Sequence, residues 1–332
     1  MAFLFDGLTR VKRAPALLAG VFVLTFVLAV PLALTLRGML QDHLGRSLAA
    51  NDVADAVNYD WWNEFTLQTS GLGTTFTPSV IGFATVLDNL SGIADARVQI
   101  VPVAGAIALY LLGWVFLSGG ILDRYARQRP IGAAAFFSAC GVYFFRFLRL
   151  TVIAGLVYWY LFGVVHQWLF AEQWASLNRE LASERTAILW RFGFYALFVV
   201  LLAIVNLIFD YAKIRAVVED RRSMIGALGA ALGFIRRHPL KVAGLYVANT
   251  LLFLVVIGLY ALMAPGAGGA GASIWVTFVI GQVYLLARLA VKLQFIASQT
   301  ALFQRSLAHA SYVANPVPSW PESPTVEALT RS

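Results

Sequence analysis

Arg288 and Lys292 stand four positions apart inside an apolar stretch near the end of the chain. A spacing of four places two side chains on one face of a helix. A lone Arg or Lys at the centre of a bilayer costs about 2.5 to 3.5 kcal/mol, so such a residue is expected to have a partner or a function. Two other apolar stretches end at Asp123 and Asp210, and we predict that Arg288 contacts one of these carboxylates and closes the end of a cavity. The alternatives are that the basic side chains reach the membrane surface or bind anionic headgroups.

A second group with chemical potential lies in a polar stretch, where Trp61 and Trp62 are flanked by Asp60 and Glu64. The two tryptophans predict an aromatic anchor at the membrane interface. The alternative is a lid over the helices, in which Asp60 and Glu64 share one helix face and His43 supplies a further metal or proton ligand.

Recognisable catalytic motifs are absent from the sequence: it has no HExxH, GxSxG, P-loop or glycine-rich dinucleotide loop. One Cys and four His exclude a disulfide framework and a thiolate metal cluster. We expect no cofactor and no resident metal, and His166 is predicted to be an interfacial residue, not a proton relay. The sequence therefore favours a protein that is not an enzyme, with a membrane-embedded enzyme as the third possibility.

The composition requires these residues to be positioned by membrane helices. Of 332 residues, 60% are hydrophobic and 13% are charged, against about 45–50% and 25% in soluble domains. A span needs about 20 apolar residues. The apolar stretch nearest the N-terminus, residues 14–36, is longer than a signal-peptide core of about 7 to 15 residues, so it is predicted to be an uncleaved anchor. The six predicted spans are 14–36, 100–122, 150–170, 189–209, 242–263 and 273–294.

The distribution of basic residues predicts the orientation. Nineteen of the 25 Lys and Arg residues fall on one side of the predicted spans and six on the other. Because basic loops stay in the cytoplasm, both termini are expected there. The sequence pI of about 9.8 then reflects topology and attraction to anionic headgroups on the cytoplasmic face. It gives no reason to expect nucleic-acid binding.

Residues 131–148 form an apolar stretch long enough for a seventh span, but only Arg149 separates it from the next one. Two antiparallel spans need a turn of about two to five residues. We therefore predict that 131–148 lies against the cytoplasmic face as an interfacial or partly re-entrant helix.

Short matches suggest an internal repeat. Lys12-Arg13-x-Pro15 resembles Arg236-Arg237-x-Pro239, and both precede a span. Shared membrane composition is the alternative explanation. The repeat predicts an all-α, polytopic helical bundle of three hairpins, 1–125, 126–215 and 216–309, each with a cytoplasmic interfacial lead-in helix. Residues 1–309 would form one transmembrane domain with an external helical insertion at 37–99. Residues 310–332, rich in Pro, are predicted to be a disordered cytoplasmic tail.

The six-span pattern and the stretch DYAKIRAVVEDRRSMIGALGAALGFIRRHP, residues 210–239, resemble poorly characterised bacterial membrane proteins. These include the YciC-like group and the membrane domain of glycerophosphodiester phosphodiesterases. The resemblance implies a membrane-embedded accessory or transport role. Because the centres of the predicted spans are mostly Leu, Val, Phe and Ala, we expect an accessory or scaffold protein of the bacterial cytoplasmic membrane, with a protein partner in the membrane. The alternative is a transporter or channel-like subunit that handles a lipid or other amphiphile.

Overall fold

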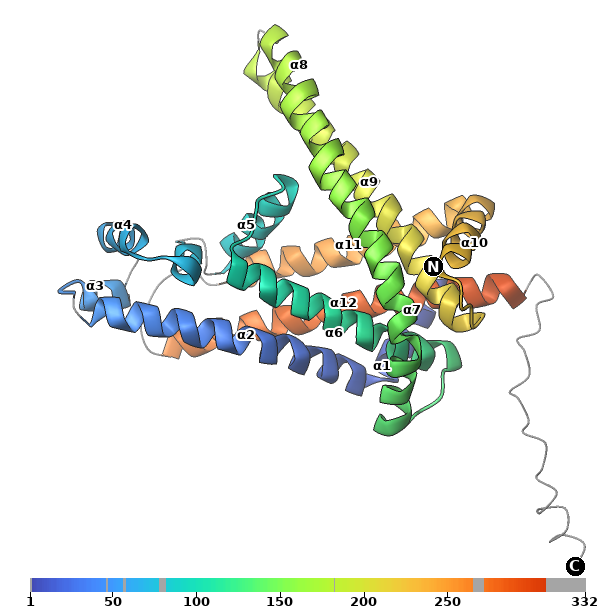
Figure 1. Cartoon of the computed structure of the whole chain (residues 1–332). Helices are drawn as coiled ribbons and strands as arrows, with labels where there is room; N and C mark the ends of the chain where they lie inside the picture. The colour runs from blue at the N-terminus through green and yellow to red at the C-terminus, as the bar shows by residue number, and fades with distance from the viewer. Residues whose placement is uncertain are drawn as a thin grey trace, which may run out of the picture.

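The computed structural model describes residues 2–45, 47–55, 58–77, 82–181, 183–264 and 272–308, and the described part is helical without strands (Figure 1). Its regular elements follow in chain order: α1 (Ala2–Lys12), α2 (Pro15–Leu44), α3 (Ala50–Asp55), α4 (Tyr59–Gln68), the 3₁₀ helix η1 (Gly71–Thr75), α5 (Phe83–Ala94), α6 (Val101–Arg127), α7 (Ala133–Tyr160), the π-helical segments η3 (Leu161–Val165) and η4 (Trp168–Gln173), α8 (Trp174–Glu180), α9 (Glu184–Val218), α10 (Met224–Arg237), α11 (Pro239–Met263) and α12 (Ala272–Ala308).

Six of these helices are long and apolar enough to cross a membrane, as predicted. The expected fold class, an all-α polytopic bundle, is confirmed. Most helices run past the predicted spans, since polar turns continue the helix beyond its apolar part: α2 reaches Leu44 and α9 reaches Val218. Pro15 and Pro239 occupy the first turns of α2 and α11, where proline removes no helical hydrogen bond. The division into three repeated units stays a prediction.

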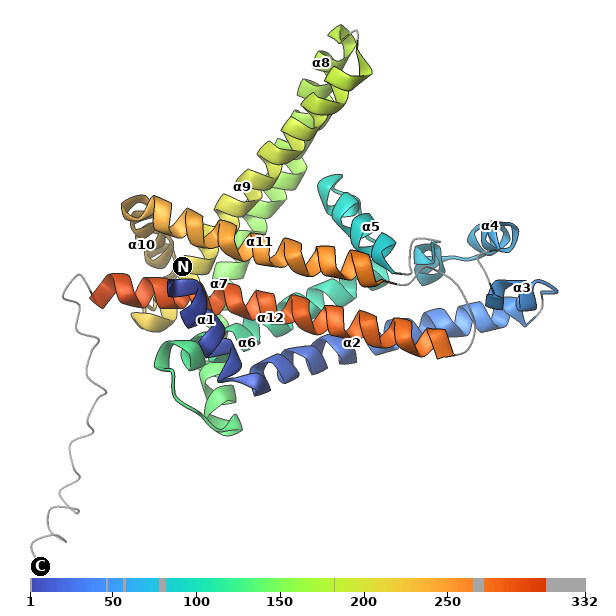
Figure 2. The same cartoon turned by 180° about the vertical axis from the view of Figure 1, so that it is seen from behind.

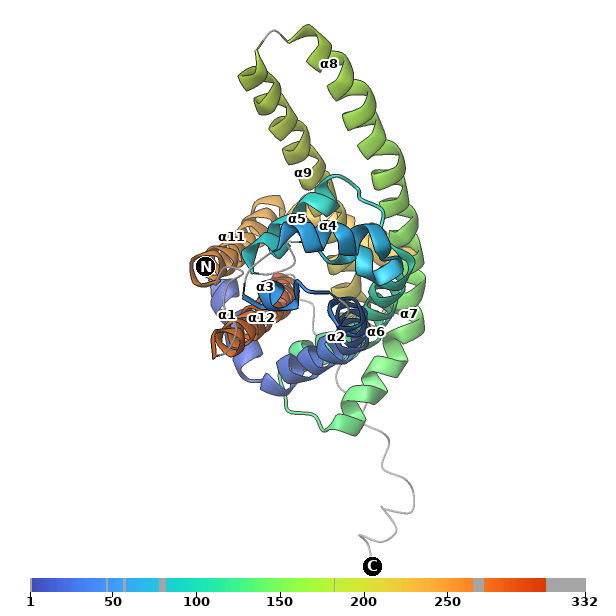
Figure 3. The same cartoon turned by 90° about the vertical axis from the view of Figure 1, so that its left-hand side faces the viewer.

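Four helices, α2, α6, α11 and α12, run alongside one another and form the body of the molecule (Figures 1 and 2). The other two spans, α7 and α9, form a hairpin that leaves this body obliquely and ends at α8. Figure 3, an end view, shows this hairpin projecting well beyond the other four helices. We call the hairpin of α7, α8 and α9 the arm.

The predicted separate helix over 131–148 is wrong. These residues begin α7, and helix continues without interruption from Ala133 to Arg179, a stretch of 47 residues. The N-terminal part of α7 packs closely on the end of α6: a Cβ on Gly119 or Gly120 would lie 2.8 Å from Tyr143 Cβ or 2.6 Å from Cys140 Sγ. Burial against α6 favours straight continuation over a turn, so no antiparallel reversal occurs at Arg149.

Two lead-in helices do exist. The short helix α1 precedes α2, and α10 precedes α11 (Figure 2). Both lie at the end of the molecule where α6, α9 and α12 terminate, and we call this the basic end because Arg and Lys residues gather there. The opposite end, which carries α3, α4 and α5, is called the far end. The predicted tail at 310–332 and most of the turn between α11 and α12 lie outside the described residues.

Candidate functional site

Lys292, on α12, lies near the middle of the bundle along its length, and its side chain is exposed. Its Nζ is 3.5 Å from the ring centroid of Trp114 and 5.4 Å from that of Tyr110. Trp114 is the middle residue of α6, thirteen residues from both Val101 and Arg127, or about 20 Å from either end at 1.5 Å per residue. A lysine side chain does not reach the end of the bundle from there. Cation–π contacts of this kind contribute about 0.5 to 2 kcal/mol and hold the ammonium group in place.

Arg288 lies one turn further from the basic end and its side chain is exposed. The predicted ion pair with Asp123 or Asp210 is wrong. Within the described part of the chain, Arg288 forms no ion pair or hydrogen bond. Both carboxylates have closer partners on their own helices, where the side chains are already aligned: Arg127 Nε is 2.7 Å from Asp123, and Lys213 Nζ is 3.3 Å from Asp210.

Asp210 nevertheless belongs to the surroundings of Lys292. Lys292 interacts electrostatically with Lys213, Arg288 and Asp210. Asn206 Nδ2 donates to Asp210 at 3.3 Å and lies 3.5 Å from the hydroxyl of Tyr246 on α11. Thus α9, α11 and α12 bring polar groups together beside α6. We call Lys213, Arg288, Lys292 and Asp210 the central cluster.

The central cluster has an excess of positive charge, since three cations face a single carboxylate. The indole Nε1–H of Trp114 is buried and has no acceptor among the described residues. Unpaired donors at this depth are costly in an apolar medium. The arrangement therefore provides cations and hydrogen-bond donors for an anion.

Asp123 does not join this cluster. It is 6% exposed and lies nine residues beyond Trp114 on α6, about 13 Å nearer the basic end. Lys213 and Trp114 were not predicted from the sequence. The predicted span ends at residue 209, whereas α9 continues to Val218, and continuation of the helix by one further turn includes Lys213.

The far-end patch has a structural role. Trp61 and Phe65 are only 4% and 2% exposed, and Trp61 Nε1 donates to His43 Nδ1 at 3.0 Å. Trp62 Nε1 donates to the carbonyl of Phe76 at 2.8 Å. The prediction of an interfacial anchor is wrong for Trp61, because its ring packs inside a small aromatic core that attaches α4 to the end of α2.

The carboxylates of this patch point outward. Asp60 and Glu64 are exposed, and Glu64 accepts a hydrogen bond from Gln68 at 3.1 Å. In the described residues, no three His, Cys, Asp or Glu side chains are grouped so that they could hold a metal ion. His43 already uses Nδ1 to accept from Trp61.

His166 and Tyr195 connect the arm to α5. His166 Nε2 donates to the carbonyl of Ala94 at 2.8 Å, and the Tyr195 hydroxyl donates to Asp95 Oδ1 at 2.6 Å. The hydrogen bond from Tyr195 lowers the pKa of Asp95. At its other end α5 meets α11, where the rings of Phe83 and Tyr260 are 6.4 Å apart. Figure 1 shows α5 placed between the arm and α11. We call these contacts the α5 bridge.

Comparison with known proteins gives no relative: no family model, curated protein or solved structure matches this chain.

Proposed function

We propose that this multi-pass membrane protein binds an anionic amphiphile, such as a phospholipid, with the anionic headgroup at the central cluster. The observation that carries the proposal is the position of Lys292 and Arg288 near the middle of the bundle, where no carboxylate among the described residues forms an ion pair with either. Both side chains are exposed at the level of the membrane interior, where a bound anion offsets the cost of holding these charges in an apolar medium.

An amphiphile suits the surroundings better than a soluble anion does. The helices beside the cluster expose apolar side chains: Leu251 and Val255 on α11 are each 56% exposed, and Ile204 on α9 is 49% exposed. Acyl chains can lie along such surfaces while the headgroup contacts the cations. The function is thus the lipid-handling alternative from the sequence analysis.

The accessory or scaffold role, ranked first from the sequence, is the competing proposal. It predicts a stoichiometric protein partner and no discrete lipid at the central cluster. For either role, the excess of Lys and Arg at the basic end supports a location in the bacterial cytoplasmic membrane with both termini in the cytoplasm.

Native mass spectrometry tests the proposal. The purified, delipidated protein is incubated with phosphatidylglycerol or with phosphatidylcholine of the same acyl chains. We expect one phosphatidylglycerol per chain to be retained preferentially. The double variant Arg288→Gln, Lys292→Gln should weaken this binding at least about tenfold, since each charged hydrogen bond contributes about 1.5 to 3 kcal/mol.

The matched control is Arg222→Gln with Lys241→Gln, two exposed basic residues at the basic end. Equal binding of both lipids, or equal binding by the two double variants, would contradict the proposal. A co-purified protein at one copy per chain, with no selective lipid, would favour the competing role.

A further inference from the structure

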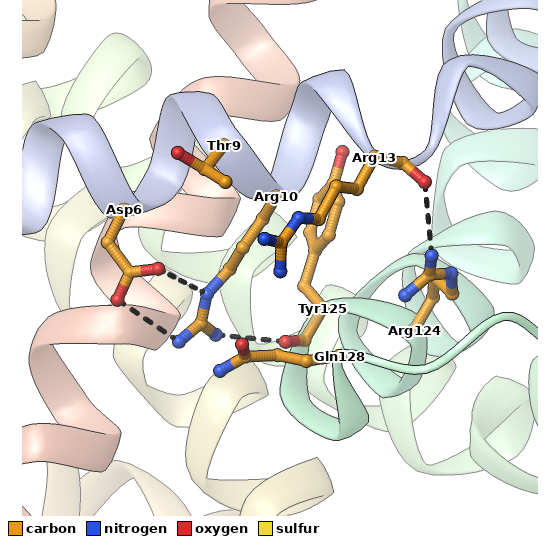
Figure 4. Close-up of a pocket in the computed structure, with 7 residues that line it drawn as sticks. All are labelled: Asp6, Thr9, Arg10, Arg13, Arg124, Tyr125 and Gln128. Carbon is orange, nitrogen blue, oxygen red and sulfur yellow. Dashed lines mark hydrogen bonds and ion pairs between the residues drawn. The ribbon is translucent and has the colours of Figure 1, made fainter.

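A separate basic pocket lies at the basic end, between α1 and the end of α6 (Figure 4). It is partly open to solvent, and its enclosed space is about 20 Å³, far below the range of about 300 to 1,000 Å³ for small-molecule pockets. The pocket therefore suits a small group held at its mouth, such as a single anion or a headgroup, and not a whole lipid.

Arg10 forms the buried side of this pocket. It is 6% exposed, and its Nη1 donates to the carbonyl of Tyr125 at 2.9 Å and to Gln304 at 2.8 Å. Its Nε lies 3.3 Å from Asp6, which also pairs with Arg305 at 3.2 Å. Asp6 is thus shared between Arg10 and Arg305, so its carboxylate does not neutralise the other arginines of the pocket.

Arg13 and Arg124 complete the basic lining. Arg124 Nη2 donates to the carbonyl of Arg13 at 3.2 Å, and neither guanidinium has an ion pair in the part of the chain that the structure describes. Figure 4 shows the guanidinium groups of Arg10 and Arg13 on the same side of α1, the side that faces α6. Like charges at this spacing repel one another. Three arginines and one aspartate give the pocket a charge of +2.

Part of this arrangement has a structural explanation. The last carbonyls of a helix have no helical partner. Arg10 donates a hydrogen bond to the carbonyl of Tyr125, and Gln304 Nε2 donates one to the carbonyl of Ala126 at 2.8 Å. This explains why Arg10 is buried between α1 and α6. It does not explain Arg13, whose guanidinium donates to no carbonyl in the described ranges.

We propose that this pocket binds a phosphate group, with the guanidinium of Arg13 contacting the phosphate oxygens beside that of Arg10 and with Arg124 adding positive charge to the lining. Guanidinium groups bind phosphate through paired, charge-assisted hydrogen bonds. The phosphate can come from a lipid headgroup or from a free phosphate ion. The proposal does not rest on the central cluster: Gln304 and Lys292 are twelve residues apart on α12, about 18 Å.

The test compares Arg13→Gln with Arg222→Gln, two substitutions of exposed arginines at the basic end. Inorganic phosphate binding is measured by calorimetry on detergent-solubilised protein, and phosphatidic acid binding by native mass spectrometry against phosphatidylcholine. We expect Arg13→Gln to weaken binding of a phosphate-bearing probe at least about tenfold. Arg13→Lys, which keeps the charge without the paired geometry, should weaken it less.

The two probes distinguish the sources. If Arg13→Gln weakens the binding of phosphatidic acid alone, the bound phosphate belongs to a lipid headgroup. If it weakens the binding of inorganic phosphate, the bound phosphate is a free ion. Equal binding by Arg13→Gln and Arg222→Gln with both probes would overturn the proposal. So would loss of inorganic phosphate binding in the Arg288→Gln, Lys292→Gln variant with Arg13→Gln unaffected, because the ion would then occupy the central cluster.

Discussion

Glu219 follows α9 and accepts hydrogen bonds from two arginines. Arg215 Nη2 lies 2.7 Å away, and Arg221 Nε also pairs with this carboxylate. Arg215 further donates to the carbonyl of Ala230 on α10 and lies over the ring of Phe303 on α12, 5.4 Å from its centroid. One carboxylate thus orients an arginine of α9 that contacts both α10 and α12 at the basic end.

Glu219→Gln should lower stability at neutral pH by about 1.5 to 3 kcal/mol, the contribution of a charged hydrogen bond. Burial raises the pKa of Glu219, but its hydrogen bonds with Arg215 and Arg221 outweigh this, so the pKa lies below its ordinary value. The stabilisation is present above the ordinary carboxyl pKa and is lost as pH falls through the lowered one.

Thermal unfolding in detergent from pH 7 to pH 3 measures this dependence. The difference between the native protein and Glu219→Gln should be largest at pH 7 and shrink in the acid range. Glu184→Gln, at an exposed position, should show no such difference. A difference in stability between the native protein and Glu219→Gln that grows as the pH falls would contradict this role of Glu219.

Arg288→Leu should leave thermal stability unchanged or raise it. The guanidinium forms no ion pair in the described residues, so its removal strands no carboxylate, and the leucine suits an apolar environment. Melting temperatures in detergent test this. A large loss of stability that Asp210→Asn partly restores would show that Arg288 and Asp210 are paired after all.

At the scale of whole elements, α7 shows that apolar content does not reveal where a helix begins or ends. Residues 131–148 and 150–170 are both apolar, and Arg149 between them suggested a boundary. Arg149 is exposed and its Nε donates to the carbonyl of Phe145 within the same helix, at 3.2 Å. A single basic residue on the outer face of a helix does not mark the end of that helix. Whether α7 continues depends on its backbone hydrogen bonds and on its packing against α6.

Arg149→Pro should therefore destabilise the protein by about 3 kcal/mol or more, the cost of proline inside a helix. Arg149→Ala, which keeps the helix, is the control and should have little effect. Expression level and melting temperature in detergent are the readouts. If both variants behave alike, the helix does not continue through this position.

The α5 bridge should depend on a single hydroxyl. Tyr195→Phe removes the donor to Asp95, so we expect faster amide hydrogen exchange in α5 and little change in α10. Tyr160→Phe, at an exposed position on the arm, is the control. Unchanged exchange in α5 would mean that His166 and Phe83 hold it without Tyr195.

At the scale of the whole molecule, the charge distribution predicts the orientation. In a background with Cys140→Ala, Leu67→Cys at the far end should react with a membrane-impermeant maleimide on intact cells. Lys12→Cys should react only after permeabilisation. Both positions are exposed in the structure. The opposite pattern would reverse the topology.

The sequence supports the number of spans because length and hydropathy are local properties. It also identified Arg288, Lys292 and Asp210, whose cost in an apolar medium is evident from residue type alone. Their partners were not predictable, because Asp210 pairs with Lys213 on its own helix and Lys292 packs on Trp114, 178 positions earlier. Trp61 was misassigned for a similar reason: an amphipathic side chain does not indicate whether lipid or protein covers it.

The contact between α1 and α12 joins residues 290 positions apart in the sequence. A Cβ on Gly7 would lie 2.7 Å from Ser298 Cβ, and the carbonyl of Leu4 accepts from Gln294 Nε2 at 2.7 Å. At about 5 to 20 residues per second, α1 waits roughly 15 to 60 seconds after emerging from the ribosome before its partner exists. During that interval its buried face must lie on the membrane surface or on another protein, and the α1–α12 contact forms only once α12 has inserted.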